Sequence, residues 1–305
     1  MSRSLTIALV SLLAGCTFNV SSFSVDDITS VAPIVPTRIH ADLSSVSFLD
    51  GFGLRVVGAP STTTATARVT ASGLLGAGVD ATAVRNGIHV TWPIDPSDAT
   101  TLGLGVTYDG PMIETVTVEG LDIALPSVTA LDLSLGSHDA EVTGVTGMLT
   151  LSTGSGSIVV HDAGDFALTA DSGSIDVAGH GGSASCTSGS VHFEASGAMT
   201  SHTTSGSIEG SFGGGGELSA TSGSVDVVLT TALDRDLTLS AESGSIHLVV
   251  PTGSSMRIET HTGSGSSHVS VGGVSSNDDF TGTIGSGGFL VRATTGSGSI
   301  HISER

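Results

Sequence analysis

The chain of 305 residues contains no lysine, and all nine of its basic residues are arginine. Without lysine, neither a phosphate loop of the Gly-Lys-Ser/Thr type nor a lysine Schiff base can form. Charged residues make up only 12% of the chain and aromatic residues 4%, which argues against a helical globular enzyme. The 29 acidic residues give a net charge of −20. An acidic chain of this kind repels phosphate backbones, so we expect no nucleic-acid partner.

Cysteine is also scarce, with Cys16 and Cys186 as the only two. Cys16 ends the stretch "MSRSLTIALVSLLAGC", in which one arginine precedes about ten apolar residues, too few to span a bilayer. "LLAGC" resembles the lipobox of bacterial lipoproteins. The resemblance implies that residues 1–15 are a signal peptide and that Cys16 carries acyl chains, palmitate among them. Thr17 then favours the outer membrane where one exists. The alternative is an ordinary secretory signal with an incidental cysteine.

A lipidated Cys16 leaves Cys186 without a partner for an intrachain disulfide, and one thiol is too few for a structural zinc site built on cysteine. Cys186 takes the position that Ala170, Ala220 and Ala241 take in other repeats, which favours a small buried side chain over a reactive thiol. Residues 16–37 are rich in serine, contain Pro33 and Pro36 and show no clear period. We expect them to form a flexible tether that holds the folded part away from the lipid.

Glycine, by contrast, is abundant, with 43 residues. Many belong to a recurring Ser-Gly-Ser-Ile phrase whose central glycines are separated by 17, 16, 17, 17, 21, 21, 22 and 11 residues. These glycines are Gly156, Gly173, Gly189, Gly206, Gly223, Gly244, Gly265, Gly287 and Gly298. A short regular period predicts a stacked repeat architecture.

The residues around each glycine alternate between apolar and polar. Apolar residues follow at the second and fourth positions, and a second alternating segment precedes the glycine. This pattern predicts two short strands per repeat, joined by a Ser-Gly-Ser corner. Stacking like strands at about 4.8 Å gives an all-β fold, a parallel β-solenoid of nine corners over residues 131–305.

Residues 38–130 are β-rich but less regular, and we expect an irregular β-layer that caps the first coil. Alternating stretches predict strands over residues 53–60, 64–71 and 87–93, and "RNG" at residues 85–87 predicts a hairpin turn. At the other end, no obvious capping segment follows the last phrase. Either Glu304 and Arg305 protect that edge or something docks there.

The "SGSI-x-V" phrases and the "GLRVVG…VRNGIHVTW" lead-in resemble bacterial envelope proteins with the DUF4097 β-strand repeat, described as adhesins. The resemblance covers most of residues 38–302. It implies a β-solenoid surface or periplasmic protein and supplies no catalytic residues.

The chain shows neither a Gly-x-Ser-x-Gly elbow nor a His-Glu-x-x-His motif, and we expect no catalytic, cofactor or metal site. One group of residues remains as a candidate site. Each successive repeat contributes to it the outward residue that lies between the two apolar positions. These residues are Asp176, His192, Glu209, Asp226 and His247, with His268 and His301 further on. One interpretation is a solvated strand face whose opposite charges fix the register; the other is a row of weak metal or proton sites.

The leading functional hypothesis is a non-enzymatic, lipid-anchored envelope protein that offers a rigid β-rod for adhesion, scaffolding or sensing. Its partners would be the membrane, through the anchor, and an envelope or surface protein or a glycan. One alternative is a β-helix enzyme that acts on polysaccharides. Another is ordering of water or ice by Ser/Thr rows.

Overall fold

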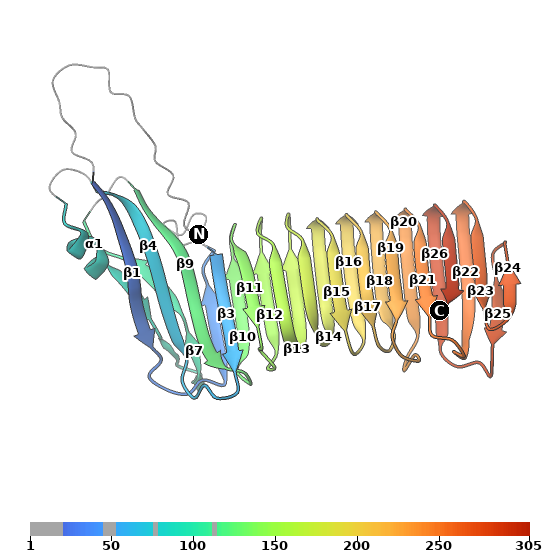
Figure 1. The fold of residues 1–305 in the computed structure, drawn as a ribbon, viewed down its shortest axis with the longest axis horizontal. Helices are drawn as coiled ribbons and strands as arrows, with labels where there is room; N and C mark the ends of the chain where they lie inside the picture. Colours follow the sequence, from blue (N-terminus) through green and yellow to red (C-terminus); the bar gives the residue numbers. More distant parts are fainter. Residues whose placement is uncertain (1–20, 45–52, 76–78, 112–114) are drawn as a thin grey trace, which may run out of the picture.

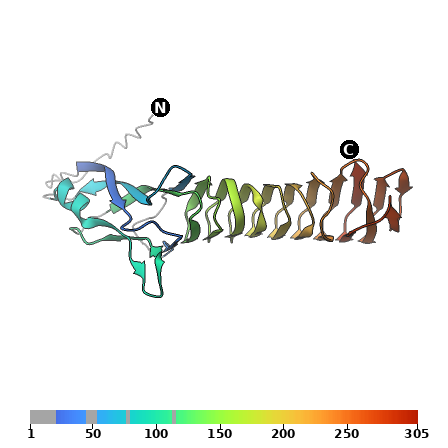
Figure 2. The same ribbon diagram turned by 90° about the horizontal axis from the view of Figure 1, so that it is seen from below.

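A computed structural model describes residues 21–44, 53–75, 79–111 and 115–305. The fold is all-β, with one short helix in the described chain, α1 (Ala81–Gly87). Figure 1 shows a long row of strands that joins a wider layer at its N-terminal end, and Figure 2 shows the row at nearly constant width. In the portion of the chain described, no helix has the length and apolarity needed to cross a membrane.

The row consists of two ladders of parallel strands that face each other. Ladder 1 contains β3 (Gly53–Ala59), β11 (Asp139–Thr143), the first halves of β13 (Ile158–Ala170) and β14 (Ile175–Ser188), β15 (Val191–Ala195), β17 (Ile208–Phe212), β19 (Val225–Leu229), β21 (Ile246–Val250), β27 (Ile300–Glu304) and β23 (Ser267–Val271).

Ladder 2 contains β2 (Arg38–Asp42), β10 (Ala130–Leu135), β12 (Leu149–Thr153), the second halves of β13 and β14, β16 (Met199–Ser205), β18 (Gly216–Ser222), β20 (Leu237–Ser243), β26 (Leu290–Ser297) and β22 (Met256–Ser264). Each Ser-Gly-Ser corner leads from a ladder 2 strand to the next ladder 1 strand. The predicted alternation therefore does build two strands per repeat.

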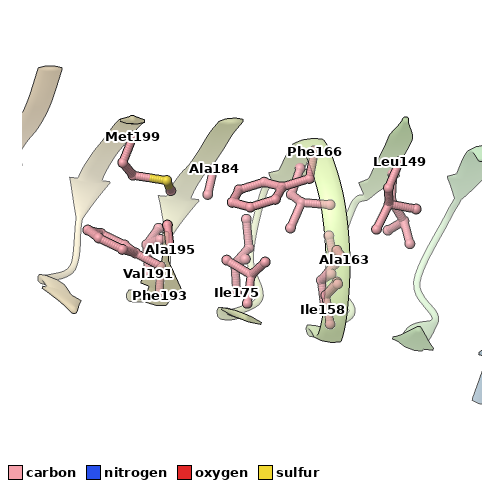
Figure 3. Packing of buried hydrophobic residues seen from close by; sticks show 14 of the residues in the cluster. Leu149, Ile158, Ala163, Phe166, Ile175, Ala184, Val191, Phe193, Ala195 and Met199 are labelled. Atoms are coloured by element: carbon pink, nitrogen blue, oxygen red, sulfur yellow. The ribbon is translucent and has the colours of Figure 1, made fainter. Parts of the chain in front are cut away.

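The core fills the space between the two ladders. Every second residue of each strand points inward, as in β15, where Val191, Phe193 and Ala195 are buried and the residues between them are exposed. Figure 3 shows Phe166 and Met199 of ladder 2 opposite side chains of ladder 1. Phe193 and Phe212 meet edge to face at 5.8 Å between ring centroids. Identical registers place like residues above one another, so the apolar core runs the length of the stack.

The corner glycines explain the recurring phrase. A Cβ on Gly173 would overlap the carbonyl oxygen of Gly156, and one on Gly189 would overlap that of Gly173. The same overlap repeats at each later corner of the stack, through Gly206, Gly223, Gly244, Gly298 and Gly265. Only glycine lets successive corners approach this closely.

The serines that follow these glycines form a second repeating contact. The backbone N–H of Ser174 donates to Oγ of Ser157 at 3.4 Å, and that of Ser190 donates to Oγ of Ser174 at 3.4 Å. The same bond recurs at Ser207, Ser224, Ser245 and Ser299, at 3.2 to 3.3 Å. The corner serines are thus structural hydrogen-bond acceptors.

The N-terminal layer is more ordered than expected. Its strands are β1 (Ser21–Val31), β4 (Thr66–Leu75), β5 (Ile88–Thr91), β6 (Ile94–Asp95), β7 (Asp98–Gly103), β8 (Gly105–Tyr108) and β9 (Thr115–Pro126). Parallel stacking starts before residue 131, because β2 pairs with β10 and β3 with β11. The expected irregular layer over residues 38–130 therefore already includes one stacked level.

The predicted tether over residues 16–37 is wrong for its described part. β1 pairs antiparallel with β4 from residue 21 to residue 31, and Phe23 and Val25 are buried against Leu75 and Val84. A serine-rich sequence without a long period concealed these apolar anchors. The predicted hairpin turn at residues 85–87 is also wrong: α1 ends there, and its first turn begins with the Asp80 carboxylate accepting from Thr82 N–H at 3.0 Å.

The far end of the stack differs most from expectation. β20 pairs with β26, and β26 pairs with β22, so the last repeat in the sequence lies between the two before it. Eight of the predicted corners stack, while Gly287 lies in the turn after β25 (Thr281–Ile284). β25 and β24 (Val274–Ser276) pair antiparallel with β22 and β23, so the stack is mixed and its end is covered.

Candidate binding surfaces

The predicted outward residues lie side by side on ladder 1. Backbone register pairs Asp176 with His192, His192 with Glu209, Glu209 with Asp226, and Asp226 with His247. His301 and then His268 follow, because the last repeat in the sequence lies between the two before it; we call this the exchanged order. We call these seven residues the acidic–histidine row.

Contacts within the row are hydrogen-bonded but exposed. His192 Nδ1 lies 3.0 Å from an Asp176 carboxylate oxygen, and His247 Nδ1 lies 3.2 Å from one of Asp226. The four side chains are 41 to 58% exposed. Because water screens such pairs, each contributes well under about 1 kcal/mol to folding.

The row ends in three neighbouring imidazoles. His301 stacks on His268 at 5.0 Å between ring centroids and lies 5.2 Å from His247. Partial burial, and then the proximity of His247 and His268, lower the pKa of His301. His268 Nδ1 lies 2.7 Å from Asn277 Oδ1, in the segment that covers the end of the stack. In the described ranges no group of three or more His, Cys, Asp or Glu side chains has the arrangement to hold a metal ion.

The outward side of ladder 2 has a different chemistry, which the sequence indicated only as rows of serine and threonine. Its central strands carry small hydroxyl side chains where ladder 1 carries charges. We call this surface the hydroxyl face; it consists of Thr150, Ser152, Thr169, Ser183, Ser185, Thr200, Ser219, Thr238 and Ser240. The signal was available in the alternating stretches "LTLST", "SAS" and "LTLSA" that precede the corners.

Within the described part of the chain, most of these hydroxyls make no side-chain hydrogen bond. Ser219 is an exception, because its Oγ lies 2.8 Å from His202 Nδ1. Ser183 and Thr200, by contrast, make no side-chain hydrogen bond within the described chain. Unlike the corner serines, they leave donor and acceptor capacity open to solvent or a ligand.

A hollow of about 480 Å³ lies along one margin of the hydroxyl face. Ser183 and Thr200 line it together with the backbone of Gly181, Gly182 and Gly216. Added Cβ atoms at these three glycines would meet neighbouring backbone, so the floor is bare main chain.

The rim of the hollow carries its polar and apolar side chains. His180 Nδ1 lies 2.7 Å from an Asp165 carboxylate oxygen, and both side chains are about two-thirds exposed. Met148, at one end, is 43% exposed. Arg235, at the other, pairs with Asp234 at 3.1 Å.

The family model for Toastrack DUF4097 matches residues 123–303, which contain both of these surfaces. The chain belongs to the Toastrack DUF4097 family. No curated protein matches this Toastrack chain.

Several solved structures are similar to it at low identity. One from Bacteroides fragilis, described as a "putative adhesin", is 11% identical with a TM-score of 0.35, and the match covers 92% of this chain and 97% of that one. Another so described, from Parabacteroides distasonis, is 8% identical with a TM-score of 0.36, covering 94% and 98%. A "putative cell adhesion protein" from Clostridium sporogenes is 10% identical with a TM-score of 0.26, covering 92% and 100%. Likeness at this level carries no information about function.

Cys186 of this Toastrack chain is buried, as predicted, with 2% exposure. Its Sγ lies 3.3 Å from the carbonyl oxygen of Gly173, the place that Thr203 Oγ1 takes against Gly189 at 3.0 Å in the next repeat. Burial raises the pKa of the Cys186 thiol to about 11. The thiol is therefore a core group and not a nucleophile. Cys16, the predicted lipidation site, lies outside the described residues.

Proposed function

We propose that this Toastrack protein is a lipid-anchored protein of the bacterial cell envelope whose β-solenoid rod is a non-enzymatic, adhesin-like binding or scaffolding surface. The observation that carries the proposal is the strict register of the two ladders. It repeats two outward faces of unlike chemistry over the central strands of the stack, from β14 to β20. Extended faces of this kind suit binding to extended partners.

The solenoid itself is supported by the way each repeat contributes. One strand of each repeat joins ladder 1 and the other joins ladder 2, and each pairs with the equivalent strand of the neighbouring repeat. The corner glycines and the serine N–H···Oγ bonds repeat with the same period. A right-angle view shows the same row of strands (Figure 2).

The proposed anchor has a short reach. Only residues 17–20 separate Cys16 from the start of β1 at Ser21. An extended chain covers about 3.4 Å per residue, so lipid on Cys16 would lie within roughly 17 Å of β1. β1 and the covered end of the stack lie at opposite ends of the molecule (Figure 1). Anchoring would thus place the N-terminal layer at the membrane surface and leave the far coils outward.

Detergent-phase partitioning of the full chain and of Cys16→Ala, expressed in a lipoprotein-processing host, tests the anchor. We expect the unchanged protein in the detergent phase and Cys16→Ala in the aqueous phase, because two or more acyl chains anchor firmly. Cys186→Ala is the matched control and should partition like the unchanged protein. Aqueous partitioning of the unchanged protein would refute the lipid anchor.

A protease-accessibility experiment on intact cells tests the envelope location. A protease site inserted in the exposed turn at Gly272–Gly273, at the far end of the rod, should be cut from outside or after outer-membrane permeabilisation. Cleavage only after lysis of the inner membrane would contradict an envelope location.

A further inference from the structure

We propose that the hollow on the hydroxyl face binds a neutral glycan chain that lies along the rod axis. This inference rests on the proposed function and names the partner class of its binding surface. The volume of the hollow, about 480 Å³, falls within the range of about 300–1,000 Å³ that ligand sites occupy.

The hollow is long and narrow. Its lining residues lie at or next to the starts of the ladder 2 segments of β12, β13, β14, β16, β18 and β20, which are neighbours in ladder 2. Five strand spacings of about 4.8 Å make the distance from Met148 to Arg235 roughly 24 Å. A ligand that fills this length is a polymer segment and not a single small molecule.

The lining chemistry matches sugar hydroxyls. Ser183 and Thr200 offer hydroxyls that no group in the described ranges uses, and the exposed pair of His180 and Asp165 adds ring nitrogen and carboxylate oxygens at the rim. Such groups can both donate to and accept from vicinal hydroxyls. Gly181, Gly182 and Gly216 line the hollow without side chains, so the polymer would contact main-chain groups there.

Apolar contacts are also present for the C–H faces of a sugar ring. The side chain of Met148 is 43% exposed at one end of the hollow, although large apolar groups in the chain are mostly buried. Ala167 and Ala198 add methyl groups beside the hydroxyls. A ligand with both hydroxyl and C–H surfaces contacts all of these groups at once.

Charge favours a neutral polymer over an acidic one. The protein carries a net charge of −20, and the arginine of the hollow is already paired with Asp234. Polyuronates, nucleic acids and other polyanions would meet repulsion without a free cationic clamp. A peptide added as a strand needs an open sheet edge, whereas this hollow lies on a sheet face whose strands are paired on both sides.

The hollow also distinguishes the site from an ice-ordering surface. Ordering water on a lattice requires a flat hydroxyl array. Here the His180–Asp165 pair rises at the rim, and His202 and Glu217 interrupt the hydroxyl positions. A groove with mixed polar and apolar walls fits a glycan better.

Titration calorimetry with soluble mannose, glucose and galactose oligosaccharides, and with oligogalacturonate as the acidic comparison, tests the inference. We expect at least one neutral oligosaccharide to bind, and Ser183→Arg and Thr200→Arg to weaken its affinity about tenfold or more. Ser211→Arg makes the same change on β17 of ladder 1 and should bind like the unchanged protein. His180→Ala removes a rim group without adding bulk and should also weaken binding. Circular dichroism confirms that each variant is folded.

Three results would overturn the inference: no neutral oligosaccharide binding at millimolar concentration, equal binding by the Arg variants, or preference for oligogalacturonate. Thermal hysteresis without glycan binding would likewise replace it with ice ordering. The detergent-phase and protease experiments do not depend on the hollow. Failure here, with anchoring and envelope location intact, would therefore leave the proposed function standing.

Discussion

The two faces of the stack are built on the same repeats but carry unlike chemistry. The acidic–histidine row of ladder 1 presents charges and imidazoles from successive strands, while the hydroxyl face of ladder 2 presents small neutral groups. Both faces share the corners, the parallel register and one core. Inward and corner positions therefore determine how the repeats stack, and outward positions are free to specialise.

The inward positions near the corners show how strictly inward and outward positions differ in the residues they accept. They hold only small residues, Ala170, Cys186, Thr203, Ala220 and Ala241 in successive repeats. At the adjacent positions, the outward side chains range from serine to histidine and glutamate. A substitution should therefore have a large effect at a corner, a moderate one inside, and a small one on either face.

The largest effect is expected at a shared corner. Gly206→Ala would place a Cβ against the carbonyl oxygen of Gly189, lowering the free energy of unfolding by about 3 kcal/mol through overpacking. The denaturation midpoint in urea measures it. Gly53→Ala is the control, because a Cβ there would contact nothing within 4 Å and should change little. An unchanged midpoint for Gly206→Ala would show that the corners can separate.

The Cys186 thiol, in the core beneath the hydroxyl face, should be protected from a thiol reagent. With a pKa raised to about 11, it is far less ionised at pH 8 than an unfolded cysteine of pKa about 8.5, so labelling should be roughly a hundredfold slower. Stopped-flow labelling in buffer and in denaturant gives the ratio, with Cys16→Ala as the background to isolate one thiol. Because the folded pKa is the higher one, this group's contribution to stability is full below about pH 8.5 and declines above it. Equal labelling rates would mean that the coil opens readily.

A moderate effect is expected at the inner column. Thr203→Val keeps the shape but removes the hydroxyl that donates to Gly189 at 3.0 Å, which should cost about 1–2 kcal/mol in unfolding free energy. Cys186→Thr places a hydroxyl at the same position one repeat earlier and should change stability by less than about 0.5 kcal/mol. If the two variants were equally destabilised, the column would be selected for volume and not for hydrogen bonding.

The smallest effect is a pH-dependent change in stability that we expect from the ladder 1 face and not from the ladder 2 face. The pKa of His301 is lowered by burial and by its two histidine neighbours, so the folded protein binds this proton less readily than the unfolded chain. Stability should therefore fall as pH drops below about 6.5. The thermal midpoint should shift by about 1 °C, since exposed charges contribute little. His301→Asn should remove this part of the acid sensitivity, whereas His202→Asn on ladder 2 should retain it. Identical pH profiles for all three proteins would contradict the assignment.

The sequence was sufficient to predict features that repeat. Period-2 alternation around Ile175 and Val177 located the strands, and the glycine spacing located the corners. It was insufficient where the placement of a strand depends on contacts that occur only once in the molecule. β1 is held in place because Phe23 and Val25 pack against α1 and β4, and no local sequence pattern predicts these contacts. The exchange of the last repeats depends on which strand pairs with β20, and periodicity treats β22 and β26 as equal candidates.

The candidate surfaces were predictable to a similar extent. The five outward residues from Asp176 to His247 followed from alternation alone. The contact of His301 with both His247 and His268 did not, because it requires the exchanged order. The hydroxyl face was visible in the sequence as alternation. The hollow at its margin is lined by Gly181, Gly182 and Gly216 at the starts of ladder 2 segments, and a linear period does not describe how these positions stack.

The position of the last repeat between the two before it has a consequence for synthesis of the chain. β22 and β23 leave the ribosome before β26 and β27, yet they rest on them. A nascent chain that has reached residue 276 lacks the strands that lie beneath β22 and β23 in the finished protein. The finished order requires β26 and β27 to take their place between the β20–β21 repeat and the β22–β23 repeat. A stop codon after residue 289 would remove these pairings and expose strand edges, and should produce an aggregation-prone product.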